Sequence, residues 1–219
     1  MCAVSEISYL RTDGFTDESF ARILEELSPL RREKAERCRV PRDAYASAAA
    51  GWLLDRALKK EGLCERDAVI VYGKNGKPYL KQGGVYFNLS HSGEIAVCAV
   101  SHQEVGVDIQ KIKPVSEALV KKVCSERELV RLSALSKRER EEEFCRLWTL
   151  KESVMKWSGE GLALLRKGLE IDFSHSHKVM CGGSELSLCL KEFALHGYKI
   201  AVCTARKEDF TLTEVDCCG

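Results

Sequence analysis

Hydrophobic and polar residues fall into two kinds of segment along the chain. Residues 44–61 and 139–158 are rich in strong helix formers, and Gly62 stands where the first helix would end. Short runs rich in Val, Ile, Tyr and Phe predict strands over residues 69–72, 86–90, 95–101, 105–110, 169–173, 187–194 and 198–205. The pattern predicts an α+β fold in which each long helix covers a small, mostly antiparallel sheet.

The chain also repeats itself. Ile95–Cys98 (IAVC) recurs from residue 200, and LSPL at residue 27 has a near copy, LSAL, at residue 132, with the same offset of 105 residues. Two matches at one offset indicate an internal duplication, although chance matching in a Leu- and Cys-rich chain remains the alternative. We therefore predict two similar lobes, residues 1–103 and 104–219, with a site between them.

Composition narrows the class of protein. The net charge is +1, so the chain shows no electrostatic drive toward nucleic acid, and no apolar stretch approaches the roughly 20 residues of a membrane span. The eleven cysteines show no zinc-like spacing, and Cys98 and Cys203 lie in apolar runs, where they act as small hydrophobes. Without a secretion signal, we expect a reduced, cytoplasmic setting.

An acidic residue interrupts the apolar strand at 105–110. Alternation places Asp108 and Gln110 on one face, and Gly106 keeps the backbone uncluttered. An acid in such a strand costs free energy unless it is paired or holds a metal ion. The ordinary alternative is a solvated Asp at the end of an edge strand.

Three further clusters carry polar chemistry. On the second helix Trp148, Glu152 and Lys156 follow at i, i+4 and i+8 and share one face, as a catalytic pair or as a solvated ion pair. His91 follows a strand in FNLSHSG, where a lone histidine is more often structural. The basic run at residues 31–42 could clamp phosphate or form a charged helix face.

The order and spacing of these motifs are more specific than any one of them. GVDIQ at 106–110, followed by FCRLWTLKESVMKWSGEGL at 144–162 and preceded by FNLSHSG at 87–93 and NGKP at 75–78, resembles the 4'-phosphopantetheinyl transferase superfamily. The resemblance covers roughly residues 25–205 and is to the larger, surfactin-synthetase-activating class, whose members are monomers of two similar lobes. It implies transfer of 4'-phosphopantetheine from coenzyme A to a serine of an apo acyl or peptidyl carrier protein. The products are the holo-carrier and adenosine 3',5'-bisphosphate.

The resemblance also implies roles for individual residues. Asp108 and Glu152 correspond to the acids that bind Mg²⁺ together with the coenzyme A diphosphate, which suits a cation that prefers a few oxygen ligands. Glu152 is also the expected base for the carrier serine, and Lys156 is expected to stabilise or protonate the leaving group. A further family acid maps to Glu128, with Glu126 as a rival.

The remaining implied contacts are to coenzyme A. The expected residues are Arg31 and Lys34 for the 3'-phosphate, Ser90 and His91 for the phosphates, and Gly76, Lys77 and Pro78 beside the adenine. Two positions depart from the family pattern: Gln110 replaces a second acid near the metal, and Ser47 replaces an arginine on the first long helix. As a fourth candidate metal ligand, Gln110 can offer only an uncharged carbonyl oxygen.

A second hypothesis is a non-catalytic coenzyme A-binding or carrier-binding protein of the same fold. Retention of Asp108, Glu152 and Lys156 argues against it, because loss of activity would release all three residues from constraint. The sequence does not indicate which carrier protein is the substrate.

Overall fold

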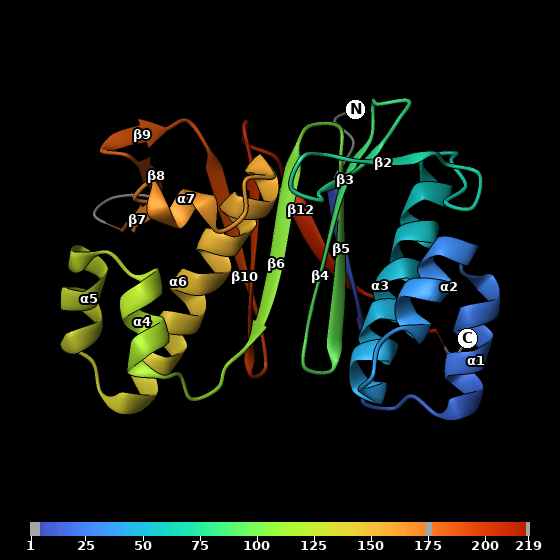
Figure 1. The fold of residues 1–219 in the computed structure, drawn as a ribbon, viewed down its shortest axis with the longest axis horizontal. Helices are drawn as coiled ribbons and strands as arrows, with labels where there is room; N and C mark the ends of the chain where they lie inside the picture. The colour runs from blue at the N-terminus through green and yellow to red at the C-terminus, as the bar shows by residue number, and fades with distance from the viewer. Residues whose placement is uncertain (1–4, 174–176, 218–219) are drawn as a thin grey trace.

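The computed structural model describes residues 5–173 and 177–217 and contains helices at both sides of a strand-rich centre (Figure 1). The helices are α1 (Asp17–Glu26), α2 (Pro29–Glu36), α3 (Pro41–Lys60), α4 (Glu117–Val123), α5 (Glu126–Ser133), α6 (Lys137–Ser158) and α7 (Ala163–Arg166). The strands are β1 (Ser5–Arg11), β2 (Ile70–Tyr72), β3 (Pro78–Leu80), β4 (Tyr86–Ser92), β5 (Ile95–Ser101), β6 (Val105–Lys111), β7 (Glu170–Asp172), β8 (Lys178–Cys181), β9 (Ser184–Leu186), β10 (Cys189–Leu195), β11 (Tyr198–Thr204) and β12 (Phe210–Glu214).

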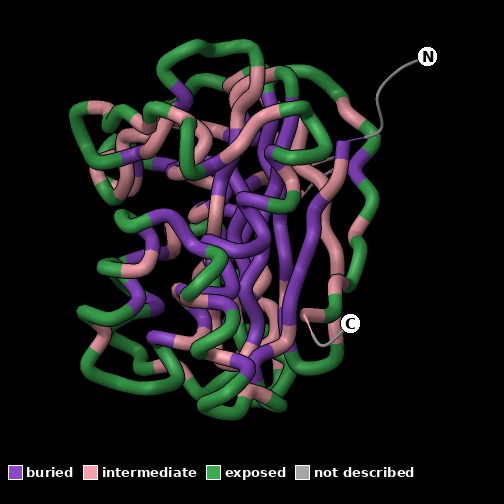
Figure 2. The backbone as a smooth tube through the Cα atoms, turned by 90° about the vertical axis from the view of Figure 1, so that its right-hand side faces the viewer, coloured by how far each residue is buried: buried purple, intermediate pink, exposed green. Residues whose placement is uncertain are grey.

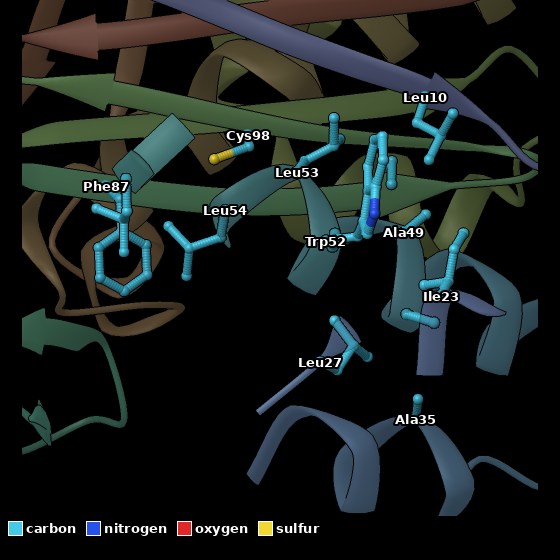
Figure 3. Packing of buried hydrophobic residues seen from close by; sticks show 14 of the residues in the cluster. Leu10, Ile23, Leu27, Ala35, Ala49, Trp52, Leu53, Leu54, Phe87 and Cys98 are labelled. Atoms are coloured by element: carbon cyan, nitrogen blue, oxygen red, sulfur yellow. The ribbon is translucent and has the colours of Figure 1, made fainter. Parts of the chain in front are cut away.

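The first long helix covers a sheet of strand order β12-β1-β5-β4. Pro41 opens α3 at a position where no backbone N–H is needed, and Gly62, with φ of 71°, follows its end. Figure 3 shows Trp52, Leu53 and Leu54 of this helix pointing toward the sheet and toward the neighbouring helices. The Trp52 indole N–H donates to Glu26 Oε2 at 2.9 Å, so its one polar atom is satisfied inside this core.

The second long helix covers a sheet of order β10-β11-β6, and its apolar face is fully buried at Leu147, Leu150 and Val154. The helix ends at Gly159, which adopts the left-handed conformation at φ of 71°. Gly106 explains how closely α6 crosses β6, because a Cβ there would lie 2.1 Å from the Ser153 carbonyl oxygen. The α+β fold with one long helix on each small sheet is therefore confirmed.

The two sheets face each other across a third core, which contains Ile7, Val97, Ile109 and Ile200. The order of layers is helix, sheet, sheet, helix, as Figure 1 shows, and Figure 2 shows the buried segments running along the central strands.

The two sheets meet edge to edge where β4 lies beside β6. The join is made by side chains: the amide N–H groups of β6 donate to polar side chains of β4. The bonds are Val107 N to Asn88 Oδ1 at 3.0 Å, Ile109 N to Ser90 Oγ at 3.4 Å, and Lys111 N to Ser92 Oγ at 3.0 Å. The alternating polar residues of FNLSHSG therefore satisfy a strand edge.

The repeat is visible in part. The matched IAVC segments lie in β5 and β11, and each of these strands pairs with a neighbour on both sides. The LSPL and LSAL segments do not correspond, because the first begins α2 and the second ends α5. The last strand, β12, pairs in parallel with β1, so the C-terminal segment returns to the first sheet. The lobe limits 1–103 and 104–219 stay a prediction.

Two further features concern the burial of the cysteines and the length of the helices. Cys98 and Cys203 are buried free thiols. Among the described helices, no segment combines the length and the apolar character that crossing a membrane requires.

Candidate active site

A groove lies where the two halves meet. Its first cavity, of about 350 Å³, is walled by α2 and α3 on one side and by β4, β6 and α6 on the other. A second cavity of about 250 Å³ lies toward the β2–β3 hairpin and shares Leu89, Glu152 and Lys156 with the first. The first cavity is lined by Arg31, Lys34, Ser47, Ala50, Leu89, Ser90, His91, Asp108, Gln110, Trp148, Glu152 and Lys156.

Asp108 is at the centre of the groove and is only 1% exposed. Its Oδ1 accepts from Ser90 Oγ at 2.7 Å and from Lys156 Nζ at 2.5 Å, and Lys156 also donates to Ser90 Oγ at 2.7 Å. Gln110 Nε2 donates to the other oxygen, Oδ2, at 2.9 Å. A buried carboxylate is stable here because charged and neutral donors surround it.

Glu152 stands one helical turn before Lys156 and faces the same groove. Burial, and secondly the negative charge of Asp108, raise the pKa of Glu152 from 4.5 to about 7, although Lys156 opposes this. Two neighbouring carboxylates repel each other, and a bound cation would relieve that repulsion.

The donor set fits Mg²⁺ better than a softer metal. Asp108 and Glu152 offer carboxylate oxygens, and no cysteine or histidine joins them to make a ligand cluster of three within residues 5–173 and 177–217. Mg²⁺ is commonly held by one or two carboxylates plus substrate phosphate and water. Gln110 lies in the same cavity, but its amide N–H orients Asp108.

Glu128 is the predicted ligand that the structure does not bring to this groove. It is buried, and its oxygens accept from Lys151 Nζ at 2.5 Å, Ser125 N at 2.7 Å and Ile171 N at 3.0 Å. Lys151 directly precedes Glu152 and therefore points to a different side of α6. These contacts give Glu128 a role in holding α5 against α6, and argue against it as a ligand of the same metal ion.

The basic residues stand at the far end of the first cavity. Arg31 is 7% exposed, its Nε donates to Glu65 at 3.4 Å, and its buried Nη2 has no hydrogen-bond partner in the described part of the chain. Burial, and then the charge of Arg31, lower the pKa of Lys34. Two cations held together in a partly buried wall are suited to an anion. Ser47 lies in the same wall, where the family pattern predicts an arginine.

His91 also lies in this wall. Its side chain is exposed at the cavity surface, but partial desolvation by the surrounding protein, and then the charge of Lys156, lower its pKa and favour the neutral ring. A neutral imidazole can donate one hydrogen bond to a phosphate oxygen without adding charge.

Gly76, Lys77 and Pro78, which are expected beside the adenine, line the second cavity. Gly76 forms the hairpin turn with φ of 84°, a conformation that favours glycine. The side chain of Lys77, in contrast, is buried away from solvent and bonds to protein groups. Sequence patterns did not signal its partners Glu104 and Trp157, nor the hydrogen bond of Asn88 to β6, because these pairings depend on the fold.

Known proteins of one kind match the chain. Residues 104–203 match the 4'-phosphopantetheinyl transferase superfamily. The chain is 30% identical to the 4'-phosphopantetheinyl transferase Sfp of Bacillus subtilis (strain 168) over 211 residues, which are 92% of this chain and 93% of that protein. It is 32% identical to the 4'-phosphopantetheinyl transferase AcpT of Escherichia coli (strain K12) over 166 residues, which are 74% and 77% of the two chains.

Proposed function

The chain belongs to the 4'-phosphopantetheinyl transferase superfamily, and from that premise we propose how its groove performs the transfer of 4'-phosphopantetheine. The enzyme has 4'-phosphopantetheinyl transferase activity of the type that converts an apo carrier protein to its holo form. The observation that carries the proposal is the convergence of Asp108, Glu152 and Lys156 on one groove between the two sheets.

Coenzyme A lies along both cavities in this proposal. Arg31 and Lys34 bind its 3'-phosphate, and the unpaired Nη2 of Arg31 supplies a free donor for that phosphate. The adenine lies against the backbone of Gly76–Pro78 in the second cavity. The diphosphate then lies near Ser90 and His91, where the two cavities join.

Asp108 and Glu152 hold Mg²⁺ in this arrangement. When bound, the ion neutralises charge on the diphosphate and makes the phosphorus easier to attack. Gln110 keeps the carboxylate plane of Asp108 fixed through its hydrogen bond to Oδ2. Ser90 fixes the other oxygen.

Proton movement follows from the two ionisable groups on α6. Glu152 accepts the proton of the carrier serine hydroxyl, directly or through water. The serine oxygen forms a new bond to the phosphorus that carries pantetheine, and the bond to adenosine 3',5'-bisphosphate breaks. Lys156 stabilises or protonates the leaving phosphate oxygen.

The test is a transfer assay with mass detection. The protein is incubated with Mg²⁺, coenzyme A and a panel of apo carriers from fatty acid, polyketide and nonribosomal peptide synthesis. A mass gain equal to phosphopantetheine is expected on at least one carrier, and it should be lost with Asp108→Asn or on chelation of Mg²⁺. Transfer that persists in both controls would contradict the metal site, and the ranking of carriers identifies the substrate.

A further inference from the structure

Lys77 lines the second cavity of the groove, but its ammonium group bonds to protein groups and does not point into the cavity. Its side chain is 6% exposed. Its ammonium donates to Glu104 Oε2 at 2.5 Å, to the Trp157 carbonyl oxygen at 2.8 Å and to the Val105 carbonyl oxygen at 3.3 Å. An ammonium has three N–H donors, so all of them are used within the protein.

These three acceptors belong to the two elements that carry the catalytic residues. Glu104 directly precedes β6, the strand of Asp108, and Val105 is its first residue. Trp157 follows Lys156 in the last turn of α6. The last carbonyl groups of a helix have no partner within the helix, and a cation there is favourable. Lys77 therefore joins the start of β6 to the end of α6.

The hairpin that carries Lys77 is tied to the same helix end a second time. Asn75 Nδ2 donates to the Gly159 carbonyl oxygen at 2.9 Å. A Cβ at Gly159 would lie 3.4 Å from Tyr79 Oη and 3.5 Å from Lys77 Cδ, so the hairpin side chains pack directly on the helix end. Lys77 Nζ also lies 5.3 Å from the centre of the Tyr79 ring.

We propose that Lys77 is a positioning residue: its buried ammonium fixes the β2–β3 hairpin against α6 and β6 and so shapes the nucleoside end of the groove, without binding the phosphates of coenzyme A. Moving the hairpin would leave a buried charge unpaired, which is strongly unfavourable. The backbone of residues 76–78 is therefore held at a fixed distance from Glu152 and Lys156. This inference rests on the proposed position of coenzyme A.

Binding measurements on the full chain separate this role from that of a phosphate ligand. The variants are Lys77→Met, which keeps the apolar stem, and Glu104→Gln, which removes the negative charge that Lys77 pairs with. Lys74→Met is the matched control, since Lys74 is exposed in the same turn and outside the cavity lining. The probes are adenosine 3',5'-bisphosphate, which carries the nucleoside, and 4'-phosphopantetheine, which lacks it.

We expect Lys77→Met to weaken adenosine 3',5'-bisphosphate about tenfold and to leave 4'-phosphopantetheine within about twofold. Glu104→Gln should weaken the same probe in the same direction, and the double variant should lose no more than Lys77→Met alone, because the two residues act as one unit. Lys74→Met should bind both probes like the wild type.

Four results would overturn the inference. Equal loss of both probes in Lys77→Met would make Lys77 a phosphate ligand, and so would tighter binding of either probe in Glu104→Gln, which frees the ammonium. A lower Tm in Lys77→Met with unchanged binding would leave a role in stability alone. If the wild type fails to bind adenosine 3',5'-bisphosphate, the proposed position of coenzyme A is wrong, and this inference falls with it.

Discussion

Replacing Glu152 by Gln should make the metal-free protein more stable at alkaline pH while abolishing transfer. The folded protein holds the Glu152 pKa at about 7, against 4.5 for an ordinary glutamate. The folded state therefore binds a proton that the unfolded state has already released between about pH 4.5 and 7. Because the folded state binds more protons in this window, the free energy of unfolding falls as the pH rises through it.

The magnitude follows from the pKa difference. A difference of about 2.5 corresponds to about 3 kcal/mol at 1.36 kcal/mol per pKa unit. Glu152 is only half-buried, and solvent screening lowers the expected value to about 1–2 kcal/mol. Glutamine resembles the protonated carboxyl group in shape and charge, so Glu152→Gln avoids this cost at every pH.

The assay is urea denaturation in EDTA at pH 5 and pH 8. The variant and the wild type should differ little at pH 5, and the variant should be about 1–2 kcal/mol more stable at pH 8. Glu36→Gln is the charge-matched control, because Glu36 is exposed, and it should show no such pH-dependent gain. An equal difference at both pH values, or a less stable variant at pH 8, would refute the argument that burial and Asp108 make the Glu152 charge costly.

Three further predictions concern the groove and its supports. Lys156→Ala should lower the transfer rate about 10²-fold or more and the coenzyme A affinity less, because its ammonium is proposed to act on the leaving group. Equal losses of rate and affinity would mean that Lys156 binds a phosphate of coenzyme A instead. The double change Arg31→Ala and Lys34→Ala should weaken coenzyme A far more than dephospho-coenzyme A in a calorimetric titration, and an equal loss would place the 3'-phosphate elsewhere. Gly106→Ala should cost about 1–3 kcal/mol in a denaturant melt, because its Cβ would lie 2.1 Å from the Ser153 carbonyl oxygen; an unchanged midpoint would contradict that close crossing.

The fold was predictable where local signals were strong. Residues 95–101 match β5 at both ends, and the two long helices begin within a few residues of their predicted starts, because apolar runs, helix formers and terminal glycines mark them. The pairing of β12 with β1 joins residues more than two hundred positions apart, which no local pattern signals. Short helices such as α4 and α5 depend on packing against α6 more than on their own composition.

The candidate site, like the fold, was predictable where short sequence motifs mark its residues. Asp108, Glu152 and Lys156 could be identified because they lie in compact motifs, and the structure brings them to one cavity. Glu128 was assigned by its match to a family acid, and that match does not reveal that Lys151 pairs with its carboxylate. Lys77 was assigned to the correct wall, but its partners Glu104 and Trp157 are 27 and 80 residues away in the chain.

The neutral residue at position 110 is explained by the hydrogen bonds of Asp108. Ser90 and Lys156 already direct their donors to Oδ1, and only Oδ2 needs a further partner. Gln110 supplies an N–H to that oxygen, which a glutamate could not do when ionised. A third carboxylate would also stand beside Asp108 and Glu152, whose mutual repulsion already contributes to the raised pKa of Glu152. In the proposed site, the glutamine would thus exchange the charge of a direct ligand for control of the Asp108 carboxylate, and the two acids and the substrate diphosphate would balance the charge of the metal ion.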